Sequence, residues 1–252
     1  MIEIFILSLI QGITEFLPIS SSSHLILISE FYNFSNGGLS VDVALHIGSF
    51  FSVILFFRKD IVKFINDKIL LSRFIIASIP IMFVGFFLVK YNLIDYLRNI
   101  EIIGWTTLIF GIMLFISDKT KESFIMKKNF SYKSAVIIGL VQILSLIPGV
   151  SRSGIAITGA RFLGFKRYDS AKISFLLSIP TLAIISVYGI KDIVESNNYN
   201  FSILNITSIF FSFIFSYLTI KYFLKFIKRF SLNIFVIYRI VLGVFILSFV
   251  YL

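Results

Sequence analysis

Long apolar stretches alternate with short polar loops along almost the whole chain. Six stretches are long enough to cross a bilayer, because a transmembrane helix needs about 20 predominantly apolar residues. They lie at 41–57, 73–90, 102–117, 172–190, 202–221 and 234–252. The pattern predicts six transmembrane helices.

Two further apolar stretches are too short to span, and each ends at a proline followed by serines. The first ends at Pro18 and the second at Pro148-Gly149, and another short helical stretch follows each break. The paired stretches are 4–17 with 21–32, and 134–147 with 153–164. Irregular backbone at membrane depth survives only where protein or a water-filled cavity covers it. We therefore expect two re-entrant helical hairpins, whose breaks expose backbone N–H groups that suit an anion.

The composition agrees with a membrane protein. The chain has 252 residues, of which 58% are hydrophobic, and its mean hydropathy is +0.96, whereas soluble domains are roughly 45–50% apolar. It contains no cysteine, which excludes thiolate metal sites and thiol redox chemistry. The first charge is Glu3 and not a basic residue, so we expect the apolar start to belong to the mature fold and not to a secretory signal.

The net charge of +10 is distributed unevenly among the loops. Most of the Lys and Arg residues fall in the turns at 58–73, 118–133, 161–172 and 221–229. The loops at 90–101 and 191–201 carry only Lys90, Arg98 and Lys191. The positive-inside rule places the first group in the cytoplasm. Because the basic residues occupy short loops between apolar spans, a nucleic-acid partner is not expected.

Loops rich in basic residues must alternate with loops poor in them along the chain. This requires that residues 1–32 enter and leave the membrane on the outer side, and residues 134–164 on the cytoplasmic side. The expected fold is thus an all-α polytopic membrane protein in one domain, with both termini extracytoplasmic. Its elements are a first half (1–118, with hairpin 1–32), a cytoplasmic loop (118–133) and a second half (134–252, with hairpin 134–164). Three spans per half invert the second half, as in inverted-repeat membrane proteins.

The first hairpin carries a candidate acid–base group. Glu15 lies four residues after Gln11, and residues four apart share a helical face. A carboxylate there suits a general base, or a ligand for a divalent cation next to phosphate oxygens. The alternative is a carboxylate that pairs with Arg152 for structure only.

Serines and a histidine follow the first break. A serine among Ser20 to Ser23 becomes a nucleophile if a base lies near it, whereas the alternative is helix capping after Pro18. His24 suits acid, base or nucleophilic chemistry near neutral pH.

The second hairpin carries a candidate anion clamp. Arg152 stands between Ser151 and Ser153 just after the break, and its planar fork of donors suits phosphate oxygens. The alternative is an arginine that snorkels or pairs with a carboxylate.

Polar residues of the full spans are weaker candidates. Asp42 and His46 share a helical face at the outer end of the first span, where they line the same cavity or form an interfacial pair. We expect Arg239, near the start of the last span, to snorkel to the interface.

These motifs resemble the undecaprenyl-diphosphate phosphatase family, also called the bacitracin-resistance family. Its first region, Glu/Gln-x-x-x-Glu followed by Phe-Leu-Pro-x-Ser-Ser and a His, matches residues 11–24 here. Its second region, Pro-Gly-x-Ser-Arg-Ser, matches residues 148–153. The resemblance covers nearly the whole chain.

The resemblance implies hydrolysis of the terminal phosphate of a polyprenyl diphosphate, which recycles the lipid carrier of peptidoglycan synthesis and confers bacitracin resistance. It implies a site open to the outer face of a bacterial cell membrane. The roles that it implies are diphosphate binding by Arg152, an acidic Glu15, a nucleophilic Ser21 and an acid or base in His24. It also implies phosphate contacts from Ser151, Ser153, Ser20 and Gln11.

Two positions depart from the usual family pattern. Gln11 leaves one carboxylate fewer for a metal, so Glu15 is the expected ligand of a divalent cation such as Mg²⁺ or Ca²⁺. Ala156 stands where the family often has Thr, so a supporting hydroxyl is missing or relocated.

The expected mechanism is phosphoryl transfer with mainly electrostatic catalysis, in which Ser21, activated by Glu15 or His24, attacks the terminal phosphorus; direct attack by water is the variant. The rival function is a transporter or a polyprenyl-phosphate flippase without hydrolysis, since inverted repeats and broken helices are transporter traits. A membrane phosphatase with paired catalytic histidines is disfavoured, because the chain has only His24 and His46. The expected surroundings are membrane lipids, and the sequence allows a homodimer without fixing the oligomeric state.

Overall fold

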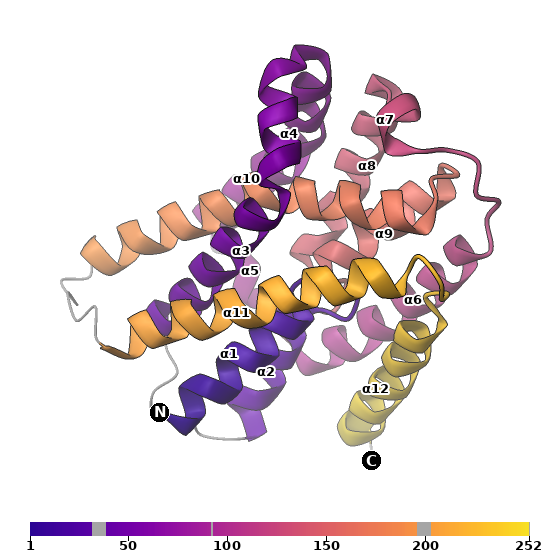
Figure 1. Ribbon diagram of the computed structural model, residues 1–252. Coiled ribbons are helices and arrows are strands. Elements are labelled where there is room, and N and C mark those ends of the chain that lie inside the picture. Colours follow the sequence, from indigo (N-terminus) through magenta and orange to yellow (C-terminus); the bar gives the residue numbers. More distant parts are fainter. Residues whose placement is uncertain (32–38, 92, 196–202, 252) are drawn as a thin grey trace.

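The protein is all-helical throughout the residues that the computed structural model describes, which are 1–31, 39–91, 93–195 and 203–251 (Figure 1). Apart from one isolated bridge between Phe124 and Phe165, this part of the chain contains no β-structure. The elements in chain order are α1 (Ile2–Thr14), α2 (Ser21–Phe31), α3 (Leu39–Asn66), α4 (Lys68–Lys90), α5 (Ile94–Leu97), α6 (Ile100–Asp118), α7 (Met126–Asn129), α8 (Tyr132–Gln142), the 3₁₀ turn η1 (Ile143–Leu146), α9 (Arg152–Phe162), α10 (Arg167–Glu195), α11 (Ile203–Phe226) and α12 (Asn233–Tyr251).

The six predicted spans are confirmed as helices long and apolar enough to cross a membrane. They are α3, α4, α6, α10, α11 and α12. Residue 202, the first of one predicted span, and residue 252, the last of another, lie outside the described part. The chain is therefore a multi-pass membrane protein.

The prediction of a turn over residues 58–73 is wrong. Helix α3 kinks at Phe57 (φ −95°, ψ 15°), where the apolar span was expected to end, and then continues to Asn66. Only Asp67 separates it from α4, whose first turn it caps by accepting a hydrogen bond from the Leu70 N–H (3.0 Å). Lysine and arginine are good helix formers, so a basic segment leaving the apolar region continues the helix.

The two short helix pairs lie where the sequence predicts hairpins. Helix α1 ends before Pro18 and α2 begins at Ser21, while α8 and η1 end before Pro148 and α9 begins at Arg152. The residue just before each second helix is a serine with positive φ, Ser20 at 75° and Ser151 at 69°. A positive φ is uncommon for a residue other than glycine, so its occurrence at both breaks fits the predicted repeat.

The first helix of each short pair packs against a span of the other half. Helix α1 packs against α11, and α8 packs against α4, while α6 packs against α12. Close approach depends on glycine: a Cβ added at Gly12 would lie 2.5 Å from the Phe215 Cβ, and one at Gly48 would lie 2.4 Å from the Ile209 carbonyl oxygen. The two halves thus pack against each other, which fits the expected inverted repeat. Both ends of the chain lie at the lower edge of the view in Figure 1.

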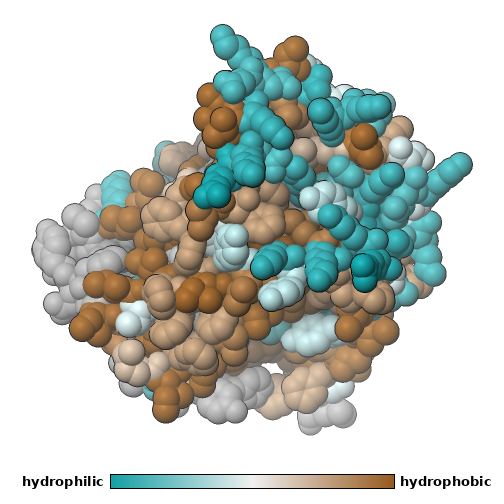
Figure 2. Space-filling view, in the orientation of Figure 1, coloured by the Kyte–Doolittle hydropathy of each residue, from teal (hydrophilic) through white to brown (hydrophobic). Residues whose placement is uncertain are grey.

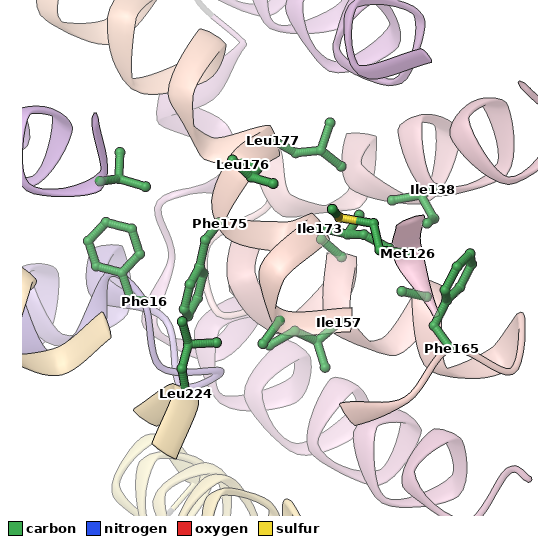
Figure 3. Packing of buried hydrophobic residues seen from close by; sticks show 14 of the residues in the cluster. Phe16, Met126, Ile138, Ile157, Phe165, Ile173, Phe175, Leu176, Leu177 and Leu224 are labelled. Atoms are coloured by element: carbon green, nitrogen blue, oxygen red, sulfur yellow. The ribbon is translucent and has the colours of Figure 1, made fainter. Parts of the chain in front are cut away.

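The main apolar core lies beside the first break. Phe16 is buried next to Glu15 and meets Phe175 of α10 edge-on, with ring centroids 5.3 Å apart (Figure 3). Side chains of α9 and α10, such as Ile157 and Ile173, continue this cluster toward Phe165. The packing fixes the backbone that carries Glu15 against the helix that follows the second hairpin.

Hydrophilic side chains gather over one part of the surface. Figure 2 shows them at the top and right of the view, over the upper end of α4, α7 and the turn between α11 and α12, while the lower left is largely hydrophobic. These segments include basic residues, namely Lys68 at the start of α4, Lys127 and Lys128 of α7, and Lys228 and Arg229 of the turn.

One basic residue of the predicted loops is fully buried. Arg161, at the end of α9, is fully buried and donates hydrogen bonds to the carbonyl oxygens of Phe165 (2.6 Å) and Thr120 (2.7 Å). Asp118 nearby pairs with Arg167 (2.7 Å) and accepts from the Leu232 N–H (3.1 Å). This polar cluster connects the ends of α6 and α9 to the starts of α10 and α12.

Candidate active site

Glu15 is the centre of a polar cluster at the first break. Its carboxylate accepts hydrogen bonds from the Ser21 hydroxyl (2.7 Å) and the Gln11 amide (3.1 Å). The i, i+4 relation of Gln11 and Glu15 is thus confirmed. The other carboxylate oxygen pairs with Arg152 of the second hairpin. One buried carboxylate therefore connects the candidate nucleophile to the candidate anion clamp.

Arg152 is the first residue of α9, and only 15% of its side chain is exposed. One terminal nitrogen of the guanidinium donates to Glu15 and the other to the hydroxyl of Thr181 on α10. A cation held in an apolar interior needs such partners. The structure therefore excludes a snorkelling Arg152 and retains the ion pair with Glu15.

The serines flanking Arg152 bond to backbone groups at the breaks. Ser153 donates to the Leu17 carbonyl oxygen (2.7 Å), and Ser151 caps α9 by accepting from the Gly154 N–H (3.1 Å). At the first break, the Ser20 hydroxyl is hydrogen-bonded to the hydroxyl of Ser23 (3.0 Å). All three hydroxyls therefore have protein partners in this structure.

His24 lies one turn beyond the serines with both ring nitrogens engaged. Its Nδ1 is 2.6 Å from the Ser20 carbonyl oxygen, and its Nε2 is 2.6 Å from the hydroxyl of Tyr238 on α12. Because a carbonyl only accepts, Nδ1 carries the hydrogen, and in the neutral ring Nε2 accepts from Tyr238. Of the two bases considered for Ser21, the one in hydrogen-bond contact is Glu15.

Arg239 is not a snorkelling residue, and that prediction is wrong. Its side chain is fully buried and donates to the carbonyl oxygens of Gly149 (2.8 Å), Val150 (3.0 Å) and Pro18 (3.3 Å). It also donates to the Thr107 carbonyl oxygen (3.2 Å). Broken helices leave carbonyl groups without helical partners, and such groups are costly inside a membrane. Arg239 satisfies them at both breaks at once.

The weaker candidates on α3 are joined through the helix backbone. The Nδ1 of His46 is hydrogen-bonded to the backbone carbonyl of Asp42 (2.8 Å), and the Asp42 side chain is exposed. This hydrogen bond lies within one turn of α3.

The sequence did not predict the contacts that three residues make in the site region. These residues are Thr181, Tyr238 and Arg239, all on transmembrane helices. A signal existed for Arg239, since an ionisable residue inside an apolar span marks a functional contact by default. No periodicity singles out Thr181, because polar residues lie on several faces of α10.

One oxygen acceptor next to Glu15 is unused. The amide oxygen of Gln11 is buried and has no hydrogen-bond partner among the described residues. Within the described ranges no group of three His, Cys, Asp or Glu side chains comes together. A carboxylate and an amide oxygen fit a hard divalent cation that takes its other ligands from phosphate and water.

Six apolar spans around a buried serine–carboxylate–arginine cluster define a polytopic membrane protein with the groups of a phosphoryl-transfer site. The chain matches the family described as bacitracin resistance protein BacA over residues 4–245, and it belongs to that family.

Similar proteins cover the chain almost completely. An undecaprenyl-diphosphatase of Pelagibacter ubique is 47% identical over 251 residues, which is 99% of this chain and 98% of that protein. Proteins with the same description from Saccharophagus degradans and Jannaschia sp. are 41% and 38% identical, covering 94% and 98% of this chain and 93% and 98% of their own lengths.

Proposed function

We propose that this membrane protein hydrolyses the terminal phosphate of undecaprenyl diphosphate or a similar polyprenyl diphosphate. The products are inorganic phosphate and the lipid monophosphate, the carrier that cell-wall synthesis uses again; removing the diphosphate accounts for bacitracin resistance. Family membership and the names of its relatives support this reaction. The observation that carries it is the contact of Glu15 with both Ser21 and Arg152.

In the proposal the diphosphate is bound by groups that stabilise negative charge. Arg152 offers a fork of donors that matches phosphate geometry. It stands at the N-terminus of α9, which adds backbone N–H groups and the positive end of the helix dipole. In the proposal the hydroxyls of Ser151, Ser153 and Ser20 and the amide of Gln11 add further phosphate contacts. The apolar tail extends between helices toward lipid.

In the proposed reaction Glu15 accepts the proton of Ser21 while the serine oxygen attacks the terminal phosphorus. The bond between that phosphorus and the bridging oxygen breaks, and the lipid monophosphate leaves with the bridging oxygen. Water then hydrolyses the phosphoserine, which releases phosphate and restores Ser21. His24, held by Ser20 and Tyr238, is the second acid–base group. Most of the acceleration comes from positioning and charge neutralisation.

A divalent cation, Mg²⁺ or Ca²⁺, is part of the proposal. Glu15 and the free amide oxygen of Gln11 would hold it. When bound, it would neutralise charge on the transferring phosphate.

The proposed location is a bacterial cell membrane, with the site facing the extracytoplasmic side and both termini outside. The hydrophilic surface over the basic segments of α4, α7 and the α11–α12 turn supports this orientation. A homodimer is compatible with the proposal, and membrane lipids and the lipid substrate are its other partners.

Phosphate release from polyprenyl diphosphate by the purified protein in detergent tests the function. Detergent micelles have no two sides, so a flippase without hydrolysis gives no signal, whereas the proposed enzyme releases phosphate. The second candidate is a flippase, which the expected inverted repeat and the broken helices would favour. Arg152→Ala should abolish release, and Arg229→Ala, which removes an exposed arginine, should not. Full activity of Arg152→Ala would contradict the assignment.

A further inference from the structure

The two terminal nitrogens of Arg152 have different partners. One donates to the carboxylate of Glu15, and the other donates to the hydroxyl of Thr181. The first partner is charged and competes with phosphate for the guanidinium. The second is neutral and comes from α10, outside both hairpins.

Thr181 is itself fixed in place. It is 7% exposed and follows Pro180 within α10. Its hydroxyl donates to the Ser178 carbonyl oxygen (3.0 Å). A hydroxyl has one hydrogen and two acceptor lone pairs, so the hydrogen points along the helix and a lone pair faces Arg152.

We propose that Thr181 is a positioning residue that sets the orientation of the Arg152 guanidinium for diphosphate binding. The proposal rests on the proposed function. When phosphate displaces Glu15 from the guanidinium, Thr181 remains as the fixed partner. The guanidinium therefore keeps its plane, and its remaining N–H groups donate to phosphate oxygens. Ala156, one turn after Arg152 on its own helix, has no hydroxyl to do this. The supporting hydroxyl therefore comes from the neighbouring helix.

The proposal predicts a specific loss in Thr181→Val, which keeps the shape but removes the hydroxyl. Hydrogen bonds to charged groups typically carry enough energy for a roughly 10- to 100-fold effect. We expect kcat/KM for polyprenyl diphosphate to fall by that factor and inorganic pyrophosphate to bind correspondingly more weakly. Thr181→Ser should stay near wild type. Ser186→Ala is the matched control, because Ser186 is buried on the same helix and its hydroxyl has no partner.

A double-mutant cycle separates positioning from mere packing. In an Arg152→Lys background the fork is absent, so adding Thr181→Val should weaken pyrophosphate binding and activity little further. An equal loss in both backgrounds would overturn the proposal, as would wild-type kinetics of Thr181→Val itself. If the wild-type protein binds pyrophosphate but releases no phosphate from the lipid, the proposed function fails, and the binding cycle still decides the role of Thr181. If the wild-type protein does neither, both proposals fall.

Discussion

Replacing Arg239 by methionine tests whether one side chain secures both hairpin breaks. The substitution keeps a long apolar side chain on α12 but removes every donor. Three carbonyl oxygens at the breaks lose this donor, those of Gly149 (2.8 Å), Val150 (3.0 Å) and Pro18 (3.3 Å). The Thr107 oxygen (3.2 Å) loses it too but lies inside α6, where a helix carbonyl also accepts an intrahelical hydrogen bond.

The expected cost follows from these contacts. A buried polar group left without a partner costs about 1–3 kcal/mol, and with partial relaxation the three carbonyls give about 3–5 kcal/mol. For a chain of this size 1 kcal/mol corresponds to roughly 2–4 °C in Tm. Arg239→Met should therefore lower the unfolding temperature in detergent by about 10 °C and remove phosphate release, because Glu15 and Arg152 lose their common support.

Thermal unfolding followed by circular dichroism, together with phosphate release below the transition, measures both effects. Arg239→Lys keeps the charge but not the fork, so an intermediate unfolding temperature is expected. Arg229→Met, at an exposed position of the α11–α12 turn, is the control. An Arg239→Met protein with the unfolding temperature and activity of the wild type would refute the reasoning.

Three further substitutions examine separate parts of the site. Ser21→Ala should reduce phosphate release by at least about 100-fold if the serine is the nucleophile; a retained rate would favour direct attack by water. Tyr238→Phe keeps the ring against His24 but removes the hydroxyl, so kcat/KM should fall roughly 3- to 10-fold, and an unchanged value would show that this contact is idle. Gly149→Ala should prevent folding, because its Cβ would lie 1.9 Å from the Thr106 hydroxyl at a φ of +93°. The measurement is loss of the monodisperse peak in size-exclusion chromatography. Gly159→Ala, whose nearest contact would be 3.4 Å, should fold, and a well-folded Gly149→Ala would contradict the packing.

The spans and short helix pairs were predictable because bilayer thickness sets a length that the apolar runs reveal directly. The breaks were predictable because proline and glycine interrupt helices in a way that tertiary context seldom overrides. Span ends were not. Helix α3 continues past Phe57 to Asn66 because helix propensity and not hydropathy decides where a basic segment stops being helical.

The site was predictable as far as local spacing reached. The Gln11–Glu15 contact follows from the helical repeat, and Glu15–Arg152 pairing stood as an alternative on grounds of charge. Thr181 and Arg239 could not be placed, because which face of an apolar span meets a hairpin depends on how the two halves interlock. The same limit concealed the burial of Arg161, which the charge pattern assigned to a loop.

The central claim is that Glu15 of one hairpin and Arg152 of the other form a single site that removes a terminal phosphate. The most direct measurement uses purified protein and polyprenyl diphosphate labelled with ³²P at the terminal phosphate. The account predicts that the label appears as inorganic phosphate, the lipid product is unlabelled, and both Glu15→Gln and Arg152→Ala abolish the release. Label retained on the lipid or released as pyrophosphate, or wild-type rates in either variant, would contradict it.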